Sequence, residues 1–331
     1  MLSSHKCEVV QINNILPHEN SDNLEIAQIF NGGYNSVVSK GQYHTNDLII
    51  FIPPDSLVDT RKPEFSFLAS RAKGDNSYVR IHACKFKGVM SYGLIIPNIY
   101  NANIGDDMAE FLGVLHYEPQ EEDKSYSVGA PNGVWTKYDI DNLRRYSSVF
   151  KNGDIVTVTE KVHGENCLAT FVDNTLHVRS RTRWKANTPS SLFWQSVLKN
   201  PGIEKFCRDN PGYGVYGEEY GKVKGFNYGL LPNTVNFACF DIRSPDGRYL
   251  HTDKWLDICE KYDIPHVPIY RYNWQFDLEA AIALAEGPCE FSGANHVREG
   301  VVVRSHAESW DETIGRKILK IVGFGYLQKK Q

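Results

Sequence analysis

The stretch TVTEKVHGENCLATF, from Thr157 to Phe171, sets a lysine between two strand-like segments. DIVTVTE before it and CLATFV after it are rich in β-branched residues, which predicts two strands, and Gly164 is expected in the turn between them. An ammonium group at a strand end, beside a glycine turn, is either a solvated surface charge or a placed reactive group. The rest of the sequence distinguishes these two interpretations of Lys161.

The size and composition of the chain indicate a globular protein with room for two cores. It has 331 residues, of which 41% are hydrophobic, and no apolar run approaches the roughly 18 residues of a membrane span. The opening MLSSHKCEVV lacks the apolar segment of a secretory signal. Seven scattered cysteines without a CxxC pair argue against a zinc cage and a disulfide framework. We therefore expect a cytoplasmic, intracellular protein with no membrane partner.

Charge is distributed unevenly along the chain, whose net charge is −4. Residues 1–130 carry 10 basic and 16 acidic side chains, whereas residues 131–331 carry 26 and 24. Basic residues cluster in RSRTRWK, from Arg179 to Lys185, and in YGKVKGF. A phosphate-binding face is therefore expected only in the second part, although charge alone does not establish one.

Residues 1–117 read as short strands separated by turn signals, which is typical of a small barrel. The candidate strands are VVQINNILP, LEIAQIF, NSVVSKG, DLIIFIPPDSLV, VRIHACKFKG and SYGLIIP. This pattern predicts an oligonucleotide-binding (OB) β-barrel. Residues 118–140 are polar and rich in Gly, Pro and Ser, which predicts a linker.

Residues 141–331 mix strand and helix patterns, which predicts an α+β domain with mostly antiparallel sheets. DIDNLRRYSSVF, residues 139–150, predicts a short helix that leads into this domain. Further helices are expected in 188–200, 252–263 and 276–287, the first ending at an Asn-Pro-Gly stop. Strands are expected in LHVRSRT, YGVYGEEYG, TVNFACFDIR, EGVVVRS and RKILKIVG.

Charged residues recur beside short apolar strands and glycines in this second part. They are Lys161, Glu218, Glu299, Lys317 and Lys320. Any one of them alone is most simply a solvated edge charge. Their order along the chain, with the aromatic FACFDIR between the two glutamates, favours a shared site instead.

The order Lys-x-His-Gly-x-Asn, Gly-Glu, Phe-Asp, Glu-Gly-Val-Val and a lysine-bearing strand resembles the covalent nucleotidyltransferase superfamily. That superfamily includes ATP-dependent DNA and RNA ligases and mRNA-capping enzymes. KVHGEN is most similar to nick-sealing RNA ligases, because the other two groups usually have Asp where His163 stands. ILPHENSDNLEIAQI and CKFKGVMSYGLIIP resemble the OB module that precedes the catalytic domain in one RNA ligase group. The resemblance implies an OB barrel followed by an ATP-grasp-like adenylyltransferase domain.

The implied activity is ATP-dependent RNA ligation, in which a 3′-hydroxyl and a 5′-phosphate end are joined through lysyl-AMP and RNA-adenylate. ATP and Mg²⁺ or Mn²⁺ are the implied cofactors. The implied partner is RNA or a nicked duplex with an RNA 3′-hydroxyl end, in a nick-sealing or RNA-repair reaction, and we expect a monomer. The alternatives are a DNA ligase, a capping-type enzyme, or an RNA-binding module on a decayed enzyme scaffold. The retained lysines and glutamates oppose decay.

In this resemblance Lys161 is the nucleophile that attacks the α-phosphate of ATP. An amine attacks only without its proton, and its ordinary pKa is about 10.4. We therefore expect the site to lower that pKa through burial, a metal ion, and the nearby cations Lys317 and Lys320. Glu218 and Glu299 are expected to hold the metal through water molecules, and Glu218 also matches a ribose-binding glutamate.

The resemblance implies roles for five further residues. Phe240 matches the ring that stacks on adenine, and Glu160 is expected to help read the same base. Asn166 is expected to bind the nucleotide or its phosphates. Arg181 is expected to contact phosphate, and His163 to serve the later sealing steps.

Two local expectations concern side-chain direction. Arg179, Arg181 and Arg183 are expected to share one face of a strand, with Arg183 and Lys185 in solvent. Lys317 and Lys320 are three residues apart, so alternation points them to opposite faces. Lys320 is favoured as the phosphate contact because LKIVGFGYL resembles the family strand that is followed by a Tyr-Leu pair. The sequence assigns no role to Arg144, Arg145 or Arg179.

Overall fold

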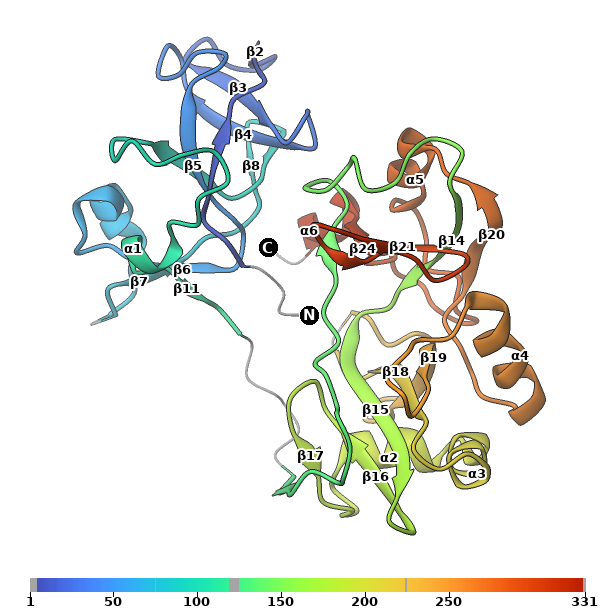
Figure 1. The fold of residues 1–331 in the computed structure, drawn as a ribbon. Helices are drawn as coiled ribbons and strands as arrows, with labels where there is room; N and C mark the ends of the chain where they lie inside the picture. Colours follow the sequence, from blue (N-terminus) through green and yellow to red (C-terminus); the bar gives the residue numbers. More distant parts are fainter. Residues whose placement is uncertain (1–4, 75, 119–124, 224, 330–331) are drawn as a thin grey trace. The chain divides into compact units, whose positions relative to one another are not determined.

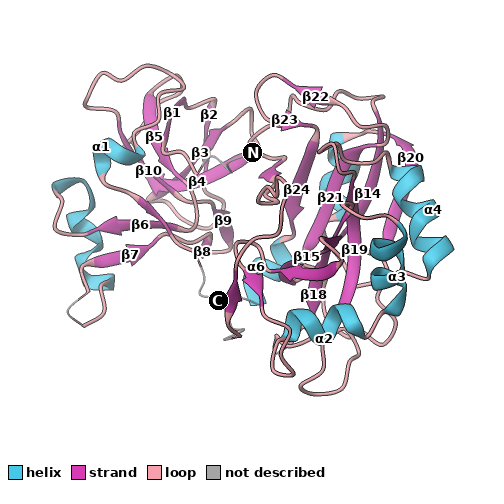
Figure 2. Cartoon of the chain, turned by 60° about the horizontal axis from the view of Figure 1, so that its bottom comes forward, coloured by secondary structure: helices cyan, strands magenta, loops and turns pink. Residues whose placement is uncertain are grey.

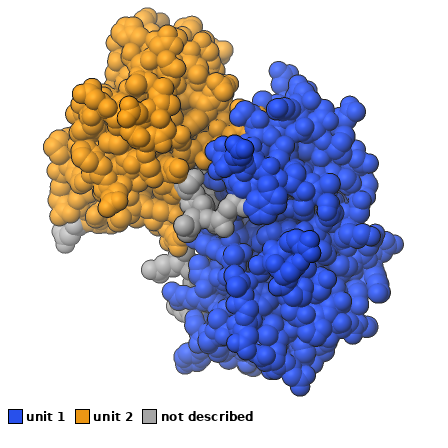
Figure 3. All heavy atoms as spheres, viewed as in Figure 1, with its two compact units in different colours: residues 1–2, 121–142, 148–329 blue, residues 3–120, 143–147, 330–331 orange. Residues whose placement is uncertain are grey.

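The structure is a computed structural model that describes residues 5–74, 76–118, 125–223 and 225–329 (Figure 1). Its contacts divide the chain into two units, shown in orange and blue in Figure 3. The N-terminal unit contains the described residues up to 118 together with Leu143–Ser147. The C-terminal unit contains residues 125–142 and Ser148–Lys329.

The N-terminal unit consists of short antiparallel strands. They form three-stranded sheets in the orders β2-β3-β4, β1-β5-β10 and β11-β6-β7, and the pair β8-β9. The elements are β1 (Glu8–Gln11), β2 (Asn14–Pro17), β3 (Leu24–Ile29), β4 (Tyr34–Ser39), β5 (Leu48–Ile52), β6 (Ser56–Asp59), η1 (Pro63–Arg71), β7 (Tyr78–Arg80), β8 (Cys84–Phe86), β9 (Val89–Ser91), β10 (Leu94–Pro97), α1 (Ala109–Leu112) and β11 (Leu115–His116). Ile50 and Ile52, two residues apart in β5, both enter a core with Val58 and Phe65.

The six strand segments predicted in this unit are present, with three subdivisions. Residues 9–17 divide between β1 and β2. Residues 47–58 divide into β5 and β6, because Pro53 and Pro54 lack the N–H groups that continue a ladder. Residues 79–88 divide between β7 and β8. The 3₁₀ helix η1 was not predicted, although it begins at a proline and places Phe65 and Leu68 on one buried side.

The segment Leu143–Ser147 is not the helix predicted for residues 139–150. It packs against the N-terminal strands instead, with Leu143 fully buried and the Arg145 guanidinium paired with Glu8. A Cβ atom on Gly33 would come within 1.8 Å of the carbonyl oxygen of Arg144, so glycine is needed for this close approach. Burial of a leucine and an ion pair here outweigh a weak local helix preference.

The C-terminal unit contains two main sheets, with strand orders β12-β17-β16-β15-β18-β19 and β13-β24-β21-β14-β20. All their pairs are antiparallel except β13 with β24. The strands are β12 (Ser127–Val128), β13 (Asp141–Asn142), β14 (Ile155–Lys161), β15 (Gly164–Val172), β16 (Thr175–Arg179), β17 (Trp184–Lys185), β18 (Gly214–Tyr220), β19 (Asn236–Arg243), β20 (Ile269–Gln275), β21 (Gly300–Ser305), β22 (Trp310–Asp311), β23 (Gly315–Arg316) and β24 (Ile318–Val322). The predicted α+β class with mainly antiparallel sheets is confirmed.

Helices cover one face of the six-stranded sheet (Figure 2). The helices of this unit are α2 (Leu192–Leu198), α3 (Pro201–Asp209), α4 (Thr252–Tyr262), α5 (Leu278–Leu284) and α6 (Phe324–Lys329). Phe193, Phe206 and Trp255, from α2, α3 and α4, pack on Val215 and Phe237 of the sheet. Helix α3 was missed because Pro201 was read as a stop, whereas it is the first residue of a new helix, where a missing N–H costs nothing.

The connection from β14 to β15 carries the chain from the five-stranded to the six-stranded sheet (Figure 1). Val162 and His163 make this turn, and Gly164 is already the first residue of β15, not the turn residue that we expected. A Cβ atom on Gly164 would come within 2.0 Å of the carbonyl oxygen of Glu219. Glycine therefore lets β15 approach β18 closely, next to Lys161.

Of the predicted linker, 118–140, residues 119–124 lie outside the described residues. Residues 125–140 belong to the C-terminal unit. Trp135 and Tyr138 pack against Leu168, Trp184 and Tyr216, so aromatic burial draws this polar segment onto the sheet.

No helix among the described residues is long and apolar enough to cross a membrane. All seven cysteines are free thiols.

Candidate functional site

Lys161 is the last residue of β14, where the chain leaves the five-stranded sheet. Its Nζ atom lies 3.0 Å from Oε1 of Glu299. Burial alone lowers the pKa of Lys161, but the carboxylates of Glu299 and Glu218 outweigh burial and raise that pKa. The expectation that neighbouring side chains lower this pKa is wrong, because the carboxylates dominate. An amine in this setting loses its proton readily only when these carboxylates are drawn to another cation.

Glu218 and Glu299 approach this lysine from different sheets. Glu299 directly precedes β21, while Glu218 lies in β18 opposite Asn166 of β15. Burial raises the pKa of Glu218 to about 8. Burial also acts to raise the pKa of Glu299, but Lys161 and His163 outweigh it and lower that pKa to about 2. Burial therefore disfavours the ionised form of Glu218, whereas the neighbouring cations favour the ionised form of Glu299.

The two glutamates fit a divalent cation that prefers oxygen ligands, such as Mg²⁺ or Mn²⁺. Within the described ranges, no group of three or more His, Cys, Asp and Glu side chains forms a metal cluster. Phosphate oxygens and water would therefore have to complete the coordination of a cation held by Glu218 and Glu299.

The two lysines near the end of the chain lie in different surroundings. Lys320 lies in β24, and burial together with the neighbouring Lys161 lowers its pKa. Lys317 precedes β24, and its Nζ atom lies 3.0 Å from Oδ2 of Asp154 and 5.0 Å from the ring centre of Phe150. The structure brings Lys320 to Lys161 and does not bring Lys317 there.

His163 lies beside the same glutamate as Lys161. Its Nδ1 atom is 3.3 Å from Oε2 of Glu299 and 2.9 Å from the hydroxyl of Tyr326. Its backbone N–H donates to the hydroxyl of Tyr228 over 2.5 Å. The structure therefore places the lysine and the histidine of the KVHG motif on the two oxygens of one carboxylate.

Phe240 occupies a β-bulge in β19. Tyr216 pairs with Asp241 and Gly217 with Cys239, so Phe240 is the extra residue between these pairs. The bulge turns the half-buried Phe240 ring toward the face of the sheet opposite the helices, where it joins an aromatic cluster.

Alternation along the strands puts Asn166 and Glu218 on this same face. Leu168 and Tyr216 pack in the cluster that Phe240 joins. Asn166 and Glu218 are each two residues along from one of them, in paired strands. The sheet thus presents an amide, a carboxylate and an aromatic ring side by side.

Glu160 is fully buried, and its hydrogen-bond partners are not the residues that surround Lys161. Its Oε2 atom accepts hydrogen bonds from the Tyr270 hydroxyl and, over 3.0 Å, from the backbone N–H of Glu290. No described residue bonds to its Oε1 atom. Glu160 adjoins Lys161 in a strand, so the two side chains point to opposite faces.

Arg181 lies in a bend after β16, and its Nη2 atom is 2.5 Å from Oδ1 of Asp139. Asp139 also acts on the pKa of Lys320, after burial and the larger effect of Lys161. Arg181 and Lys320 are therefore cations that share an acidic neighbour at the edge of the site.

The expected row of Arg179, Arg181 and Arg183 on one strand face is wrong. Strand β16 ends at Arg179, whose Nη1 atom donates to the carbonyl oxygen of Trp135 over 3.1 Å. The chain then bends before β17 begins at Trp184. Lys185 is also buried rather than in solvent, whereas Arg183 is exposed as expected.

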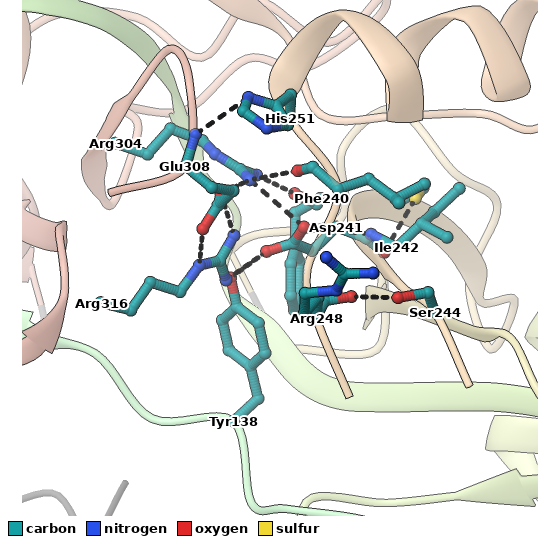
Figure 4. A network of polar contacts seen from close by, with 12 residues as sticks. Tyr138, Phe240, Asp241, Ile242, Ser244, Arg248, His251, Arg304, Glu308 and Arg316 are labelled. Atoms are coloured by element: carbon teal, nitrogen blue, oxygen red, sulfur yellow. Dashed lines mark hydrogen bonds and ion pairs between the residues drawn. The ribbon is translucent and has the colours of Figure 1, made fainter. Parts of the chain in front are cut away.

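A buried ion network lies directly behind Phe240 and was not predicted (Figure 4). Arg304 Nη2 lies 3.3 Å from Oδ1 of Asp241, and Arg316 Nη1 lies 2.5 Å from Oδ2. Both arginines also contact Glu308, and the Tyr138 hydroxyl donates to Asp241. The only sequence signal was the Phe-Asp pair itself, since pairing of charges so far apart in the chain leaves no local pattern.

The pKa of Glu218 predicts how pH affects stability. Because folding raises this pKa from 4.5 to about 8, the protonated carboxyl is compatible with burial and stability is lost as pH rises between these values. We expect Glu218→Gln to match the wild type near pH 5 and to melt several degrees higher at pH 8.5 in metal-free buffer. The exposed Glu279→Gln should follow the wild type at every pH. Equal wild-type and Glu218→Gln melting temperatures at pH 8.5 would contradict the assignment.

Comparison with known proteins agrees with this arrangement. The family model described as RNA ligase matches residues 154–322, and one described as an OB-fold domain matches residues 7–98. No curated protein matches the chain in sequence. In a protein of this class, Lys161, the two glutamates Glu218 and Glu299, and Lys320 come together between two sheets. The chain belongs to the RNA ligase family.

Solved structures share the fold at low identity. A lysine-to-alanine mutant of the Naegleria gruberi RNA ligase, with ATP and Mn, superposes with a TM-score of 0.84 at 20% identity, covering 97% of this chain and 98% of that chain. A glutamate-to-alanine mutant with AMP and Mn gives 0.84 at 21%, covering 97% and 98%. The same ligase with PPi gives 0.82 at 21%, covering 97% of each chain.

Proposed function

We propose that this protein is an ATP-dependent RNA ligase that joins RNA 3′-hydroxyl and 5′-phosphate ends through a lysyl-AMP intermediate. The observation that carries the proposal is the meeting of Lys161, Glu218, Glu299 and Lys320 at one point between the sheets. Family membership supports the RNA substrate. The ATP, AMP and Mn named for the Naegleria structures support ATP and a divalent metal as cofactors.

In the first step Lys161 attacks the α-phosphorus of ATP, so that an N–P bond forms and the bond to pyrophosphate breaks. The amine must lose a proton first, and Glu299 holds that proton in place through its ion pair. Glu218 and Glu299 would hold Mg²⁺ or Mn²⁺, whose charge neutralises phosphate oxygens and competes with Lys161 for these carboxylates. Lys320 faces Lys161 with a positive charge that suits the phosphates.

In the second step Lys161 is the leaving group, and in the third step it takes no part in the bond changes. An oxygen of the RNA 5′-phosphate attacks the AMP phosphorus, the N–P bond breaks and Lys161 regains its proton. The RNA 3′-hydroxyl then attacks the 5′-phosphorus and releases AMP. His163, on the same carboxylate as Lys161, is the side chain that we assign to these sealing steps.

The remaining roles follow from placement on the sheet. Phe240 presents a ring for adenine to stack on, which is worth about 1–3 kcal/mol by analogy with base stacking. Asn166, on the same face, is placed to bind the nucleotide. Arg181 serves as a phosphate contact once Asp139 releases it. Glu160 takes part in reading adenine only through its unpartnered Oε1 atom.

We propose that a groove on the N-terminal unit holds the RNA, as a nicked duplex with an RNA 3′-hydroxyl end. The groove has a volume of about 990 Å³ and is lined by Phe67, Arg71 and His82, among others. Phe67 is 61% exposed although it is a large apolar side chain. An exposed aromatic ring beside cationic side chains is the combination that binds bases and phosphates together.

Replacing Phe67 and Arg71 with alanine should weaken RNA binding by about tenfold or more, because a stacking ring and a phosphate contact are lost. Enzyme adenylation should stay unchanged, since its residues lie in the C-terminal unit. Binding is measured by titration of labelled nicked duplex at fixed salt. Ile104→Ala, equally exposed but outside the groove, is the control. Unchanged affinity of the double variant would reject the groove.

We propose that the protein acts as a monomer, and seven free cysteines support an intracellular setting. The function is tested by incubating the protein with Mg²⁺, ATP and a nicked duplex with RNA at the 3′-hydroxyl side. We expect a joined strand and one AMP released for each join. Joining with an all-DNA nick at the same rate would favour a DNA ligase, and labelling by GTP alone would favour a capping-type enzyme.

A further inference from the structure

Tyr326 lies in the C-terminal helix α6, beyond the segment that the RNA ligase family model matches. Its side chain is buried, and its hydroxyl lies 2.9 Å from Nδ1 of His163. We propose that Tyr326 is a positioning residue, which holds the His163 ring in the orientation that the sealing steps require. The inference rests on the proposed RNA ligation.

The contacts of the His163 ring determine where its proton resides. Nδ1 faces two oxygens, the Tyr326 hydroxyl and Oε2 of Glu299. An ionised carboxylate only accepts hydrogen bonds, so Nδ1 carries the hydrogen and donates it. Within the described part of the chain, no residue bonds to Nε2. Nε2 is therefore the edge of the ring that remains for an RNA end.

Glu299 alone cannot maintain this arrangement, because it has a second partner. Its Oε1 atom lies 3.0 Å from Lys161, and a cation bound with the phosphates would attract the same carboxylate. When Glu299 turns toward either of them, Nδ1 loses one of its two acceptors. The hydroxyl of Tyr326 does not depend on that change, so it keeps Nδ1 on this side of the ring and leaves Nε2 as the free nitrogen.

The fold holds Tyr326 firmly enough for this task. The backbone N–H groups of Phe324 and Gly325, at the start of α6, donate to the two carboxylate oxygens of Glu286 over 2.6 and 3.1 Å. A Cβ atom on Gly323 would come within 2.4 Å of the carbonyl oxygen of Ala285, so the helix begins in close contact with the chain after α5. Glu286 and Gly323 thus fix the position from which Tyr326 reaches His163.

His163 is also fixed at its backbone, so only the ring needs a further restraint. Its N–H donates to the buried hydroxyl of Tyr228. The rings of Phe226 and Tyr326 meet it edge-on, with centroids 4.9 and 5.3 Å away. These contacts limit where the ring lies but not whether Nδ1 or Cδ2 faces Glu299, because a flip of the flat ring exchanges these two atoms within the same space. The Tyr326 hydroxyl and Glu299 are the contacts that distinguish the two orientations.

The test is Tyr326→Phe, which keeps the ring and removes only the hydroxyl. The substrate is a 5′-adenylated RNA strand annealed next to an RNA 3′-hydroxyl end, which isolates the last step from ATP. We expect sealing to fall by about tenfold, the effect of one lost buried hydrogen bond, while adenylation of Lys161 stays within about twofold. Tyr220→Phe is the control, because Tyr220 packs on Tyr228 without contacting His163.

A second measurement reports on the ring itself. In ¹⁵N-histidine spectra, His163 is identified by the signals that are missing in His163→Ala. We expect the Nδ1 signal of His163 to shift in Tyr326→Phe, because that nitrogen loses its hydrogen bond to the hydroxyl. Sealing at the wild-type rate, an unchanged His163 spectrum, or an equal fall of adenylation and sealing would each overturn the inference. A wild type that forms no lysyl-AMP would instead reject the proposed function, whatever the spectra show.

Discussion

Lys161→Arg should form no covalent adduct with AMP, a loss of at least about a thousandfold in the rate of labelling. Arginine keeps the positive charge that Glu299 and Glu218 face, so the variant should fold and retain its other contacts. A guanidinium does not lose its proton in a protein and has no nucleophilic amine to offer. The variant thus removes the reaction and leaves the electrostatics of the site.

The labelling is measured with ATP labelled at the α-phosphate, after denaturing electrophoresis. Lys317→Ala is the matched control, because Lys317 is engaged by Asp154 and lies away from Lys161. It should label at nearly the wild-type rate. Lys320→Ala should label far more slowly, because Lys320 is the lysine of this strand that lies beside Lys161. Labelling of Lys161→Arg at the rate of Lys317→Ala would remove Lys161 from its role.

The second large effect concerns Asp241→Asn. Arg304 and Arg316 lower the pKa of the fully buried Asp241 against the opposing effect of burial. Without the carboxylate charge, Glu308 is left to neutralise two buried guanidinium groups. Removing one partner of a buried ion pair costs about 3–5 kcal/mol. For a unit of this size we expect the melting temperature to fall by roughly 10 °C.

Thermal unfolding of Asp241→Asn is compared with that of Asp246→Asn, an acidic residue near the end of the same strand that pairs with Arg248 in solvent. The exposed pair should contribute little to stability, because water screens its charges. Because Asp241 adjoins the bulge at Phe240, we also expect Asp241→Asn to weaken ATP binding below its melting temperature. Equal melting temperatures of the two variants would show that the buried network is not what stabilises this part of the sheet.

Part of the central site could be predicted from the sequence because two of its charges lie where a β-rich segment begins or ends. Lys161 closes one such segment, Glu299 opens another, and glycines mark both places. The three-residue spacing of Lys317 and Lys320 also predicted that only one of them faces Lys161. Short-range pattern and alternation were sufficient for these residues.

The residues that hold the site in place could not be predicted from the sequence, because they contact partners that are distant in the chain. Asp241 lies 63 residues from Arg304 and 75 from Arg316, and Tyr326 lies 163 residues from His163. No local periodicity records such pairs. The composition of residues 118–140 predicts a linker. In the structure, however, Trp135 and Tyr138 of this segment bury their rings against the sheet, a long-range contact that composition does not reveal.

The sequence also could not predict whether the pKa of Lys161 is raised or lowered. A row of lysines and glutamates does not reveal which charge lies nearest, and the distance of 3.0 Å to Glu299 decides it. The pKa is raised, so release of the proton depends on what engages the carboxylates.

The most direct measurement is the location of AMP on the protein. Wild-type protein is incubated with ATP and Mg²⁺ and cleaved under conditions that preserve the phosphoramidate bond, and the peptides are sequenced by mass spectrometry. The account predicts a single modified peptide, with the mass of AMP on the side chain of Lys161. AMP on Lys320 or any other residue, or no modified peptide from active protein, would contradict it.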